Sequence, residues 1–261
     1  MLKKRLIPKL QLKKQILGGS SHMVLVTTIQ FGKVIDIGDP ISQAKIFQAQ
    51  AADELIFLDI DPYSHNQRDF VDIIRHASEE IFMPLTVGGG IRSIEDIRLF
   101  LQNGADKVSI NTAAVETPNF VSKSSSYFGS QCIVVNIDFK LKQNKAIVVT
   151  DCGNTETELD VVSWAKTCEE LGAGEILLTS IDRDGTGKGL ATDVAKLVSN
   201  VINIPVILSG GCGLTQHFID GFQDAQVDAI SAGTYFCFKD ENPMQTRSQL
   251  NNAGIPIRIH T

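Results

Sequence analysis

The feature of this sequence that most constrains its fold is an internal repeat that spans about half of the chain. Three pairs of segments carry it: MPLTVGGG and IPVILSGG, ADKVSINT and VDAISAGT, and ELIFLDID and EILLTSID. The members of each pair stand 121 or 122 positions apart. Because three segments return at nearly one offset, we expect a duplicated structural unit. The sequence therefore predicts a single domain, residues 1–261, with two similar halves at about 1–125 and 126–261.

Short apolar runs alternate with amphipathic segments along the whole chain. The expected strands are 5–11, 54–60, 84–88, 106–111, 131–138, 175–180, 204–209 and 227–232, and the clearest expected helices are 41–52, 93–103, 159–171 and 216–224. Near-continuous apolar strands separated by helices are typical of a parallel sheet that is buried on both faces. Eight such units predict an α/β fold, a single (β/α)8 TIM barrel, with an open doubly wound sheet as the alternative.

One segment departs from the repeat, the long connection at 13–38 after the first strand. It contains Gly18, Gly19, Ser20 and Ser21, followed by MVLVTTIQF. A connection of this length is typical of a functional lid or binding loop, and we expect it to break the symmetry between the halves.

Composition and charge exclude several classes of function. The net charge of −6 argues against the basic face that a large nucleic-acid footprint needs. No apolar run approaches the roughly 20 residues that span a bilayer. The basic start, MLKKRLIPKLQLKKQ, lacks the apolar region of a signal peptide. We therefore expect a cytoplasmic protein that binds neither nucleic acid nor membranes.

Cysteine and histidine usage gives no sign of a metal site. The five cysteines have no CxxC spacing, so we expect reduced thiols. Cys152 has no histidine placed to activate it, and the five histidines are scattered without metal-ligand spacing. We expect no metal and no cofactor.

Glycine-rich strand ends recur in both halves of the sequence. Residues 88–90 and 111–112 end two strands of the first half, and residues 209–211 and 233–234 end the corresponding strands of the second half. Glycines at such positions let backbone N–H groups approach an anion closely. They also form tight turns with no ligand, but a matched pair in each half favours two phosphate-binding motifs. The second motif lies where barrels commonly bind phosphate.

Seven segments carry a resemblance to a known family: RLIP, DELIFLDI, PLTVGGGIRS, GADKVSINTAAVE, FGSQCIVV-ID, GAGEILLTSIDRDGT and SGG-G. They resemble the cyclase subunit of imidazole glycerol phosphate synthase, of histidine biosynthesis, over nearly the whole chain except 9–36. The resemblance implies a lyase or synthase that adds ammonia to a bisphosphorylated aminoimidazole-carboxamide ribonucleotide. It also implies a partner glutaminase at the N-terminal face of the barrel, which supplies the ammonia. The implied products are imidazole glycerol phosphate and the carboxamide ribonucleotide.

The resemblance also assigns binding roles. It implies a first phosphate motif made of Gly90, Asn111 and Thr112. The implied second phosphate motif is made of Gly185, Gly211, Gly233 and Thr234.

Four charged residues at strand starts match an ammonia gate of that family: Arg5, Glu54, Lys107 and Glu175. All four carry the family's residue type, and Glu54 and Glu175 are repeat partners. Charges at strand starts also form solvent-facing salt bridges. The agreement at four positions favours an ammonia entrance.

The catalytic pair is where this chain departs from the family. The family uses aspartates at the ends of strands one and five as general base and general acid. Strand five keeps Asp138, but IPKLQLKKQ places Gln11 at the position of the base and changes a neighbour to Lys9. A carboxamide can orient a substrate by hydrogen bonds, but it cannot accept and return a proton at neutral pH. Further acidic candidates for substrate binding or proton transfer lie at strand ends: Asp59, Asp61, Asp182 and Asp184.

The change at Gln11 leaves several reactions open. One is the histidine-pathway cyclase, with weak or absent turnover. The segment VTTIQFGKVIDIGDPI resembles another branch of the family, which forms an amidine on a nucleotide sugar or phosphosugar for surface polysaccharides. A third interpretation is a non-catalytic partner that regulates a glutaminase. The related sugar isomerase barrel shares the two-phosphate design, but it needs an acid–base residue on strand one, and the gate residues favour the cyclase.

Overall fold

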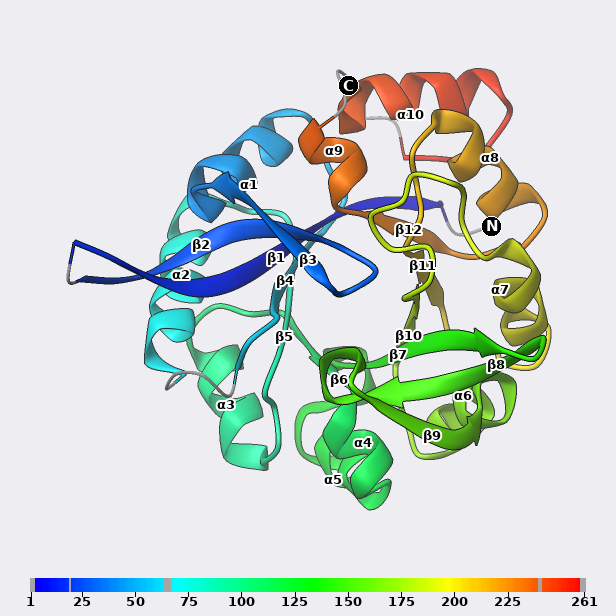
Figure 1. Cartoon of the computed structure of the whole chain (residues 1–261), viewed down its shortest axis with the longest axis horizontal. Helices are drawn as coiled ribbons and strands as arrows, with labels where there is room; N and C mark the ends of the chain where they lie inside the picture. The colour runs from blue at the N-terminus through cyan, green and yellow to red at the C-terminus, as the bar shows by residue number, and fades with distance from the viewer. Residues whose placement is uncertain (1–2, 19, 63–66, 239–240, 259–261) are drawn as a thin grey trace.

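The computed structural model describes residues 3–18, 20–62, 67–238 and 241–258 of the chain. Eight parallel strands form a closed barrel: β1 (Arg5–Leu17), β4 (Leu55–Asp59), β5 (Leu85–Gly88), β6 (Lys107–Ile110), β7 (Ile133–Lys142), β10 (Glu175–Ser180), β11 (Val206–Ser209) and β12 (Ala229–Ala232). Their hydrogen-bonded order is β10–β11–β12–β1–β4–β5–β6–β7, and pairing of β7 with β10 closes the barrel (Figure 1). The predicted TIM barrel is confirmed, and the division near residue 125 stays a prediction.

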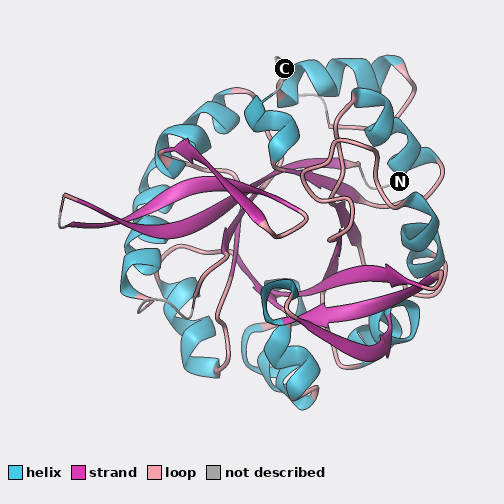
Figure 2. Cartoon of the chain, in the orientation of Figure 1, coloured by secondary structure: helices cyan, strands magenta, loops and turns pink. Residues whose placement is uncertain are grey.

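Helices surround the barrel (Figure 2): α1 (Pro40–Ala49), α2 (Arg68–Glu80), α3 (Ile94–Gln102), α5 (Asn119–Phe128), α6 (Val161–Glu170), α7 (Thr192–Ser199), α8 (Thr215–Gln223) and α10 (Pro243–Asn252). Shorter helices, α4 (Thr112–Glu116) and α9 (Thr234–Phe238), follow β6 and β12. Among the described residues, none of the helices is long and apolar enough to cross a membrane.

Helix starts follow from capping chemistry. Ser93 and Asp96 form a capping box at the start of α3. The helix expected at 159–171 begins later, at Val161, because Asp160 accepts a hydrogen bond from the Ser163 N–H at 2.9 Å. Residues up to Asp160 belong instead to a strand.

The connection at 13–38 is an antiparallel ribbon, and its role as a functional lid or binding loop stays a prediction. The first extension (residues 13–38) consists of the end of β1, β2 (Ser20–Ile29) and β3 (Lys33–Gly38). A second extension (residues 139–160) consists of the end of β7, β8 (Lys145–Thr150) and β9 (Thr155–Asp160). The expectation that the connection at 13–38 breaks the symmetry between the two halves is therefore wrong. Figure 1 shows both extensions in front of the barrel opening.

Positive-φ turns make these ribbons possible. Gln30 and Phe31 adopt φ of 53° and 59° between β2 and β3, and Gln143 and Asn144 adopt 50° and 63° between β7 and β8. Two consecutive left-handed residues match the right-handed twist of paired strands. None of these positions is glycine, so the turn signal in the sequence was weak.

A small apolar cluster fills the barrel lumen. Its members are fully buried: Ile7, Ile56, Val134, Leu177, Ile207 and Ala229. Side chains alternate between the lumen and the helices along each strand. The larger core cluster therefore lies separately, between strands and helices.

Aspartates hold the N-terminal ends of neighbouring strands in register. Asp53, which precedes β4, accepts the Leu6 N–H at 2.8 Å, and Asp228, which precedes β12, accepts the Val206 N–H at 3.1 Å. Each carboxylate satisfies a backbone donor at the start of a strand. This arrangement fixes the rim on which the gate candidates lie.

We expect Leu177→Ala to lower the free energy of unfolding by about 2–5 kcal/mol, because it leaves a cavity in the lumen cluster. Leu197→Ala is the matched control, since Leu197 is 57% exposed on α7 and should change stability by at most about 0.5 kcal/mol. Urea unfolding followed by circular dichroism measures both. Equal losses in the two variants would contradict a packed lumen.

Candidate active site

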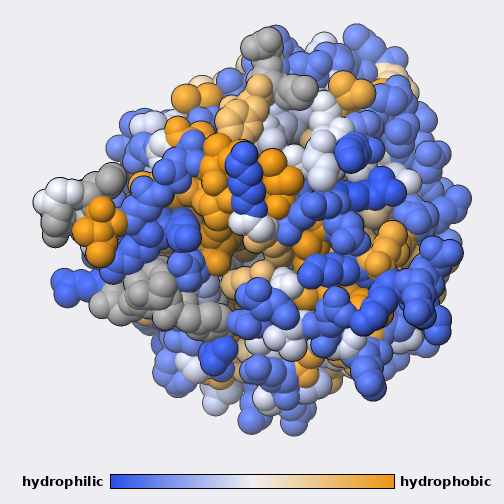
Figure 3. Space-filling view, viewed as in Figure 1, coloured by the Kyte–Doolittle hydropathy of each residue, from blue (hydrophilic) through white to orange (hydrophobic). Residues whose placement is uncertain are grey.

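A cavity of about 370 Å³ opens at the carboxyl ends of the barrel strands. Its lining comes from β1, β4, β7, the turns after β5 and β6, and both extensions; it includes Lys9, Gln11, Phe31, Asp59, Asn111, Asp138 and Cys152. Figure 3 views this face: hydrophilic side chains cover most of it, and hydrophobic ones show around the centre. The cavity therefore lies where TIM barrels carry their active sites.

Asp138 is a buried acid in the cavity wall with a raised pKa. Its side chain is only 6% exposed, and its Oδ2 accepts hydrogen bonds from Asn111 Nδ2 at 2.8 Å and from Asn136 Nδ2 at 3.1 Å. Burial raises the pKa of Asp138 to about 6, although the Lys9 cation and the two amides favour the carboxylate. A carboxyl with this pKa can both donate and accept a proton near neutral pH.

Cys152, also in the cavity wall, is a poor nucleophile. Burial, and then the negative charges of Asp138 and Asp151, raise the pKa of the Cys152 thiol to about 11. The thiolate is the reactive form of cysteine, so this side chain stays a thiol at neutral pH.

Gln11 is held by the first extension. The Thr28 N–H donates to Gln11 Oε1 at 3.0 Å, and Gln11 Nε2 lies 3.0 Å from Thr28 Oγ1. Both ends of the amide are therefore engaged within the protein. Gln11 was predicted at the position of the missing base. Thr28 was not predicted, because its only signal was its place in the segment after the first strand.

Lys9 is a buried cation in the cavity wall. It is 4% exposed, and its Nζ lies 3.4 Å from Asp184 Oδ1. Asp184 Oδ2 also accepts the Thr28 hydroxyl at 2.9 Å. We call Gln11, Thr28 and Asp184 the clasp, because they join strand β1, the first extension and the segment after β10.

The other acidic candidates are divided between the cavity and its surroundings. Asp59 and Asp61 line the cavity. Asp182 turns toward the second extension, where its Oδ2 accepts the Leu141 N–H at 2.7 Å. Asp184 lies under the first extension in the clasp.

The first phosphate motif faces the cavity. Gly90, Asn111 and Thr112 all line it. Gly90 has φ of 70°, and an added Cβ would lie 2.7 Å from the Pro62 Cβ, so only glycine fits. The Asp151 N–H donates to Thr112 Oγ1 at 3.0 Å, so the second extension contacts this motif.

The second phosphate motif lies under the first extension. Thr27 Oγ1 is 2.9 Å from Thr234 Oγ1, and a Cβ on Gly185 would lie 2.1 Å from the Thr28 carbonyl oxygen. Gly211 packs equally closely on the backbone of Gly189, and Gly233 packs on that of Lys9. Among the described residues that line the cavity, none belongs to this motif. The structure therefore does not bring the two motifs into one cavity.

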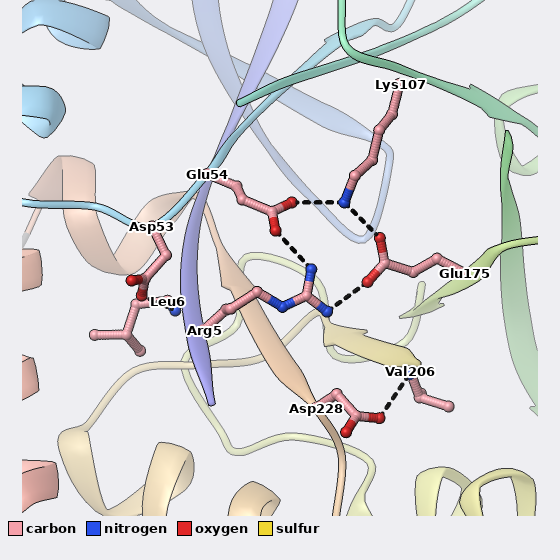
Figure 4. Close-up of polar contacts among 8 residues, drawn as sticks. All are labelled: Arg5, Leu6, Asp53, Glu54, Lys107, Glu175, Val206 and Asp228. Carbon is pink, nitrogen blue, oxygen red and sulfur yellow. Dashed lines mark hydrogen bonds and ion pairs between the residues drawn. The ribbon is translucent and has the colours of Figure 1, made fainter. Parts of the chain in front are cut away.

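The four gate candidates meet at the opposite end of the barrel in a closed ring of alternating charge (Figure 4). Arg5 Nη1 lies 2.6 Å from Glu54 Oε1, and Arg5 Nη2 lies 2.5 Å from Glu175 Oε1. Lys107 Nζ lies 3.0 Å from the other oxygen of each glutamate. We call these four residues the charged ring.

Burial and charge act against each other in the ring. Burial disfavours the charged forms of Arg5, Lys107 and Glu54, but the opposite charges on either side outweigh it. The pKa values of Arg5 and Lys107 are therefore raised, and the pKa of Glu54 is lowered. The ring thus stays charged while only partly exposed to solvent. The apolar lumen cluster lies above it, between the ring and the cavity.

Within the described part of the chain, no group of three or more His, Cys, Asp or Glu side chains could hold a metal ion.

The fold and the cavity define a (β/α)8 barrel protein whose candidate site lies at the carboxyl ends of its strands. A family model described as "Histidine biosynthesis protein" matches residues 8–241. The chain is 46% identical over 260 residues, which is 99% of each sequence, to the "Putative imidazole glycerol phosphate synthase subunit hisF2" of Prochlorococcus marinus (strain MIT 9313). The chain therefore belongs to the histidine biosynthesis protein family, and the predicted resemblance is confirmed.

We expect Lys9→Met to raise the pKa of Asp138 above about 6, because the Lys9 cation favours the carboxylate form. Carboxyl ¹³C chemical shifts followed through a pH titration measure it. Lys13→Met is the matched control: Lys13 also lines the cavity, but it pairs with Asp61 at 3.9 Å, so its loss should leave the Asp138 titration unchanged. A lower Asp138 pKa in Lys9→Met would contradict this account of the site.

Proposed function

We propose that the chain is an ammonia-using lyase or synthase subunit of the imidazole glycerol phosphate synthase type. A phosphorylated acceptor binds in the cavity, with its phosphate at the first phosphate motif, and ammonia reaches it through the lumen. The observation that carries this proposal is that Asp138 lines the cavity at the carboxyl ends of the strands, while the charged ring lies at their amino ends and the apolar lumen cluster separates the two.

Each step of the proposed chemistry has a candidate residue. Ammonia reacts through its lone pair, so ammonium must lose a proton before it attacks. The charged ring with an apolar layer above it suits entry of the neutral molecule, since an apolar lumen disfavours an unpaired ion. When nitrogen adds to the acceptor carbon, the new C–N bond sheds a proton and the departing oxygen gains one. Asp138 is the group that exchanges these protons.

The proposal includes a partner. The ring lies at the N-terminal face, so a glutaminase subunit that binds there would release ammonia directly into the lumen. Such an assembly would work in the cytoplasm, where glutamine is available.

In its histidine-pathway form, this activity converts the bisphosphorylated ribonucleotide to imidazole glycerol phosphate. That reaction would use both phosphate motifs and a second acid–base group on β1. Gln11 cannot supply that group, and its amide is engaged with Thr28. These contacts favour the second candidate, an amidine-forming subunit for a nucleotide sugar or phosphosugar.

We expect Asp138→Asn to reduce ammonia-dependent product formation by about 100- to 10,000-fold, the usual contribution of a general acid–base group. Asn is close in size to Asp, so phosphate binding should persist. Product release from the acceptor, with ammonium chloride as the nitrogen source, measures the effect. Wild-type turnover in this variant would show that Asp138 is not the catalytic acid–base group, whereas no product from the unmodified chain would support a non-catalytic partner of a glutaminase.

We expect weak or absent turnover of the bisphosphorylated ribonucleotide by the unmodified chain, because the Gln11 amide cannot act as a general acid or base at neutral pH. Mass spectrometry of imidazole glycerol phosphate formed with ammonium chloride checks it. Cyclisation at rates comparable with those of a histidine-pathway cyclase, assayed in parallel, would rule out this interpretation and assign the chain to that pathway.

A further inference from the structure

We propose that the cavity selects an acceptor with a single phosphate group, because the clasp closes the second phosphate motif. This inference deepens the proposed function and rests on it only in identifying the ligand as the acceptor.

The clasp ties the first extension to β1 through the side chain of Gln11. Thr28 gives this amide a backbone N–H donor, and its hydroxyl lies within hydrogen-bond distance of both amide atoms, at 3.0 and 3.3 Å. Gln11 and Thr28 are 6% and 3% exposed. A buried amide with both of its groups paired in this way strongly favours one position of the extension.

Further contacts extend this closure over the second motif. The Gln30 N–H donates to the Asp184 carbonyl oxygen at 2.9 Å, and Gln30 Nε2 donates to the Asp182 carbonyl oxygen at 2.7 Å. Thr27 contacts the Thr234 hydroxyl, which is the group that would otherwise bind phosphate. The Thr28 carbonyl oxygen also packs closely on Gly185, so an electronegative atom lies beside the second phosphate motif. The extension thus occupies the place that a second phosphate would take.

Charge at this end of the cavity also disfavours a second phosphate. Lys9 already pairs with Asp184, and Asp138 lies close enough to both for their charges to shift its pKa. A phosphate dianion here would meet two carboxyl groups and a cation that is already paired. The first motif lies away from the clasp, and its side of the cavity also includes Arg92. The ligand therefore has one anionic end at the first motif and an uncharged reacting end near Asp138, so of the two acceptor classes named above it is the phosphosugar and not the nucleotide sugar.

Phosphate stoichiometry tests the proposal on the intact chain. Isothermal titration with inorganic phosphate should give one site per chain. Glycerol 3-phosphate and fructose 1,6-bisphosphate should bind within about tenfold of each other, because the second phosphate gains no contact. Two sites, no site, or a bisphosphate preference of 100-fold or more would overturn the proposal.

Matched variants locate the site. Thr112→Val should weaken phosphate binding at least tenfold, whereas Thr234→Val should leave it unchanged. The reverse pattern would overturn the proposal. The two substitutions remove the same hydroxyl from corresponding positions of the two motifs, so each serves as the control for the other.

Releasing the clasp should expose the second motif. We expect two phosphate sites per chain in the double variant Gln11→Ala/Thr28→Ala and one site in Gln15→Ala, which removes a Gln15–Asp36 hydrogen bond elsewhere in the same extension. One site in a folded double variant would show that the clasp does not close the motif. If the double variant fails to fold, the wild-type stoichiometry and the threonine pair still decide the question.

These outcomes separate the inference from the proposed function. One phosphate site without any ammonia-dependent turnover would leave the single-phosphate selection standing and remove the synthase proposal. Ammonia-dependent turnover of a bisphosphorylated acceptor, with two phosphates bound per chain, would leave the synthase proposal standing and remove the single-phosphate selection.

Discussion

Closure of the eight-stranded barrel is the constraint on which the site depends. Once β7 pairs with β10, every second side chain of each strand must enter the lumen. Along β1 this places Arg5, Ile7, Lys9 and Gln11 in one column. The column runs from the charged ring through the apolar cluster to the cavity wall and the clasp. A single strand therefore links both ends of the molecule, and a shift of one residue would turn all four side chains toward the helices.

The two extensions create a cross-connection between the halves of the sequence. The first extension contacts Thr234 through Thr27, and the second contacts Thr112 through Asp151. Gln11 and Asp138 occupy equivalent places, because each pairs with a valine of its own extension, Val26 or Val149. The scaffold is therefore similar in the two halves. The difference between them comes from side chains: on one side the Gln11 amide holds its extension, and on the other the Asp138 carboxyl faces the cavity and accepts hydrogen bonds from Asn111 and Asn136.

The barrel was predicted well because its eight apolar strands and its internal repeat are both visible as local patterns in the sequence. The four ring residues were singled out by the resemblance to the family, because each carries the family's residue type at a strand start, and the structure brings them together. The extensions were missed because their turns use Gln30, Phe31, Gln143 and Asn144 rather than glycine. The contact of the first extension with Thr234 could not be predicted, because Thr27 and Thr234 lie 207 positions apart and meet only through the path of the first extension.

The changes at Lys9 and Gln11 make physical sense together. Lys9 brings a buried positive charge that Asp184 balances, while Asp138 stays close enough for Lys9 to lower its pKa. An aspartate at position 11 would add another carboxyl to this buried group and raise the pKa of Asp138 further by repulsion. It would also lack the amide donor that Gln11 directs at Thr28. A neutral Gln11 keeps the local charge balanced and the extension attached. Lys9, Gln11 and the clasp therefore form one connected arrangement, in which Asp184 balances the lysine and the neutral amide holds the first extension.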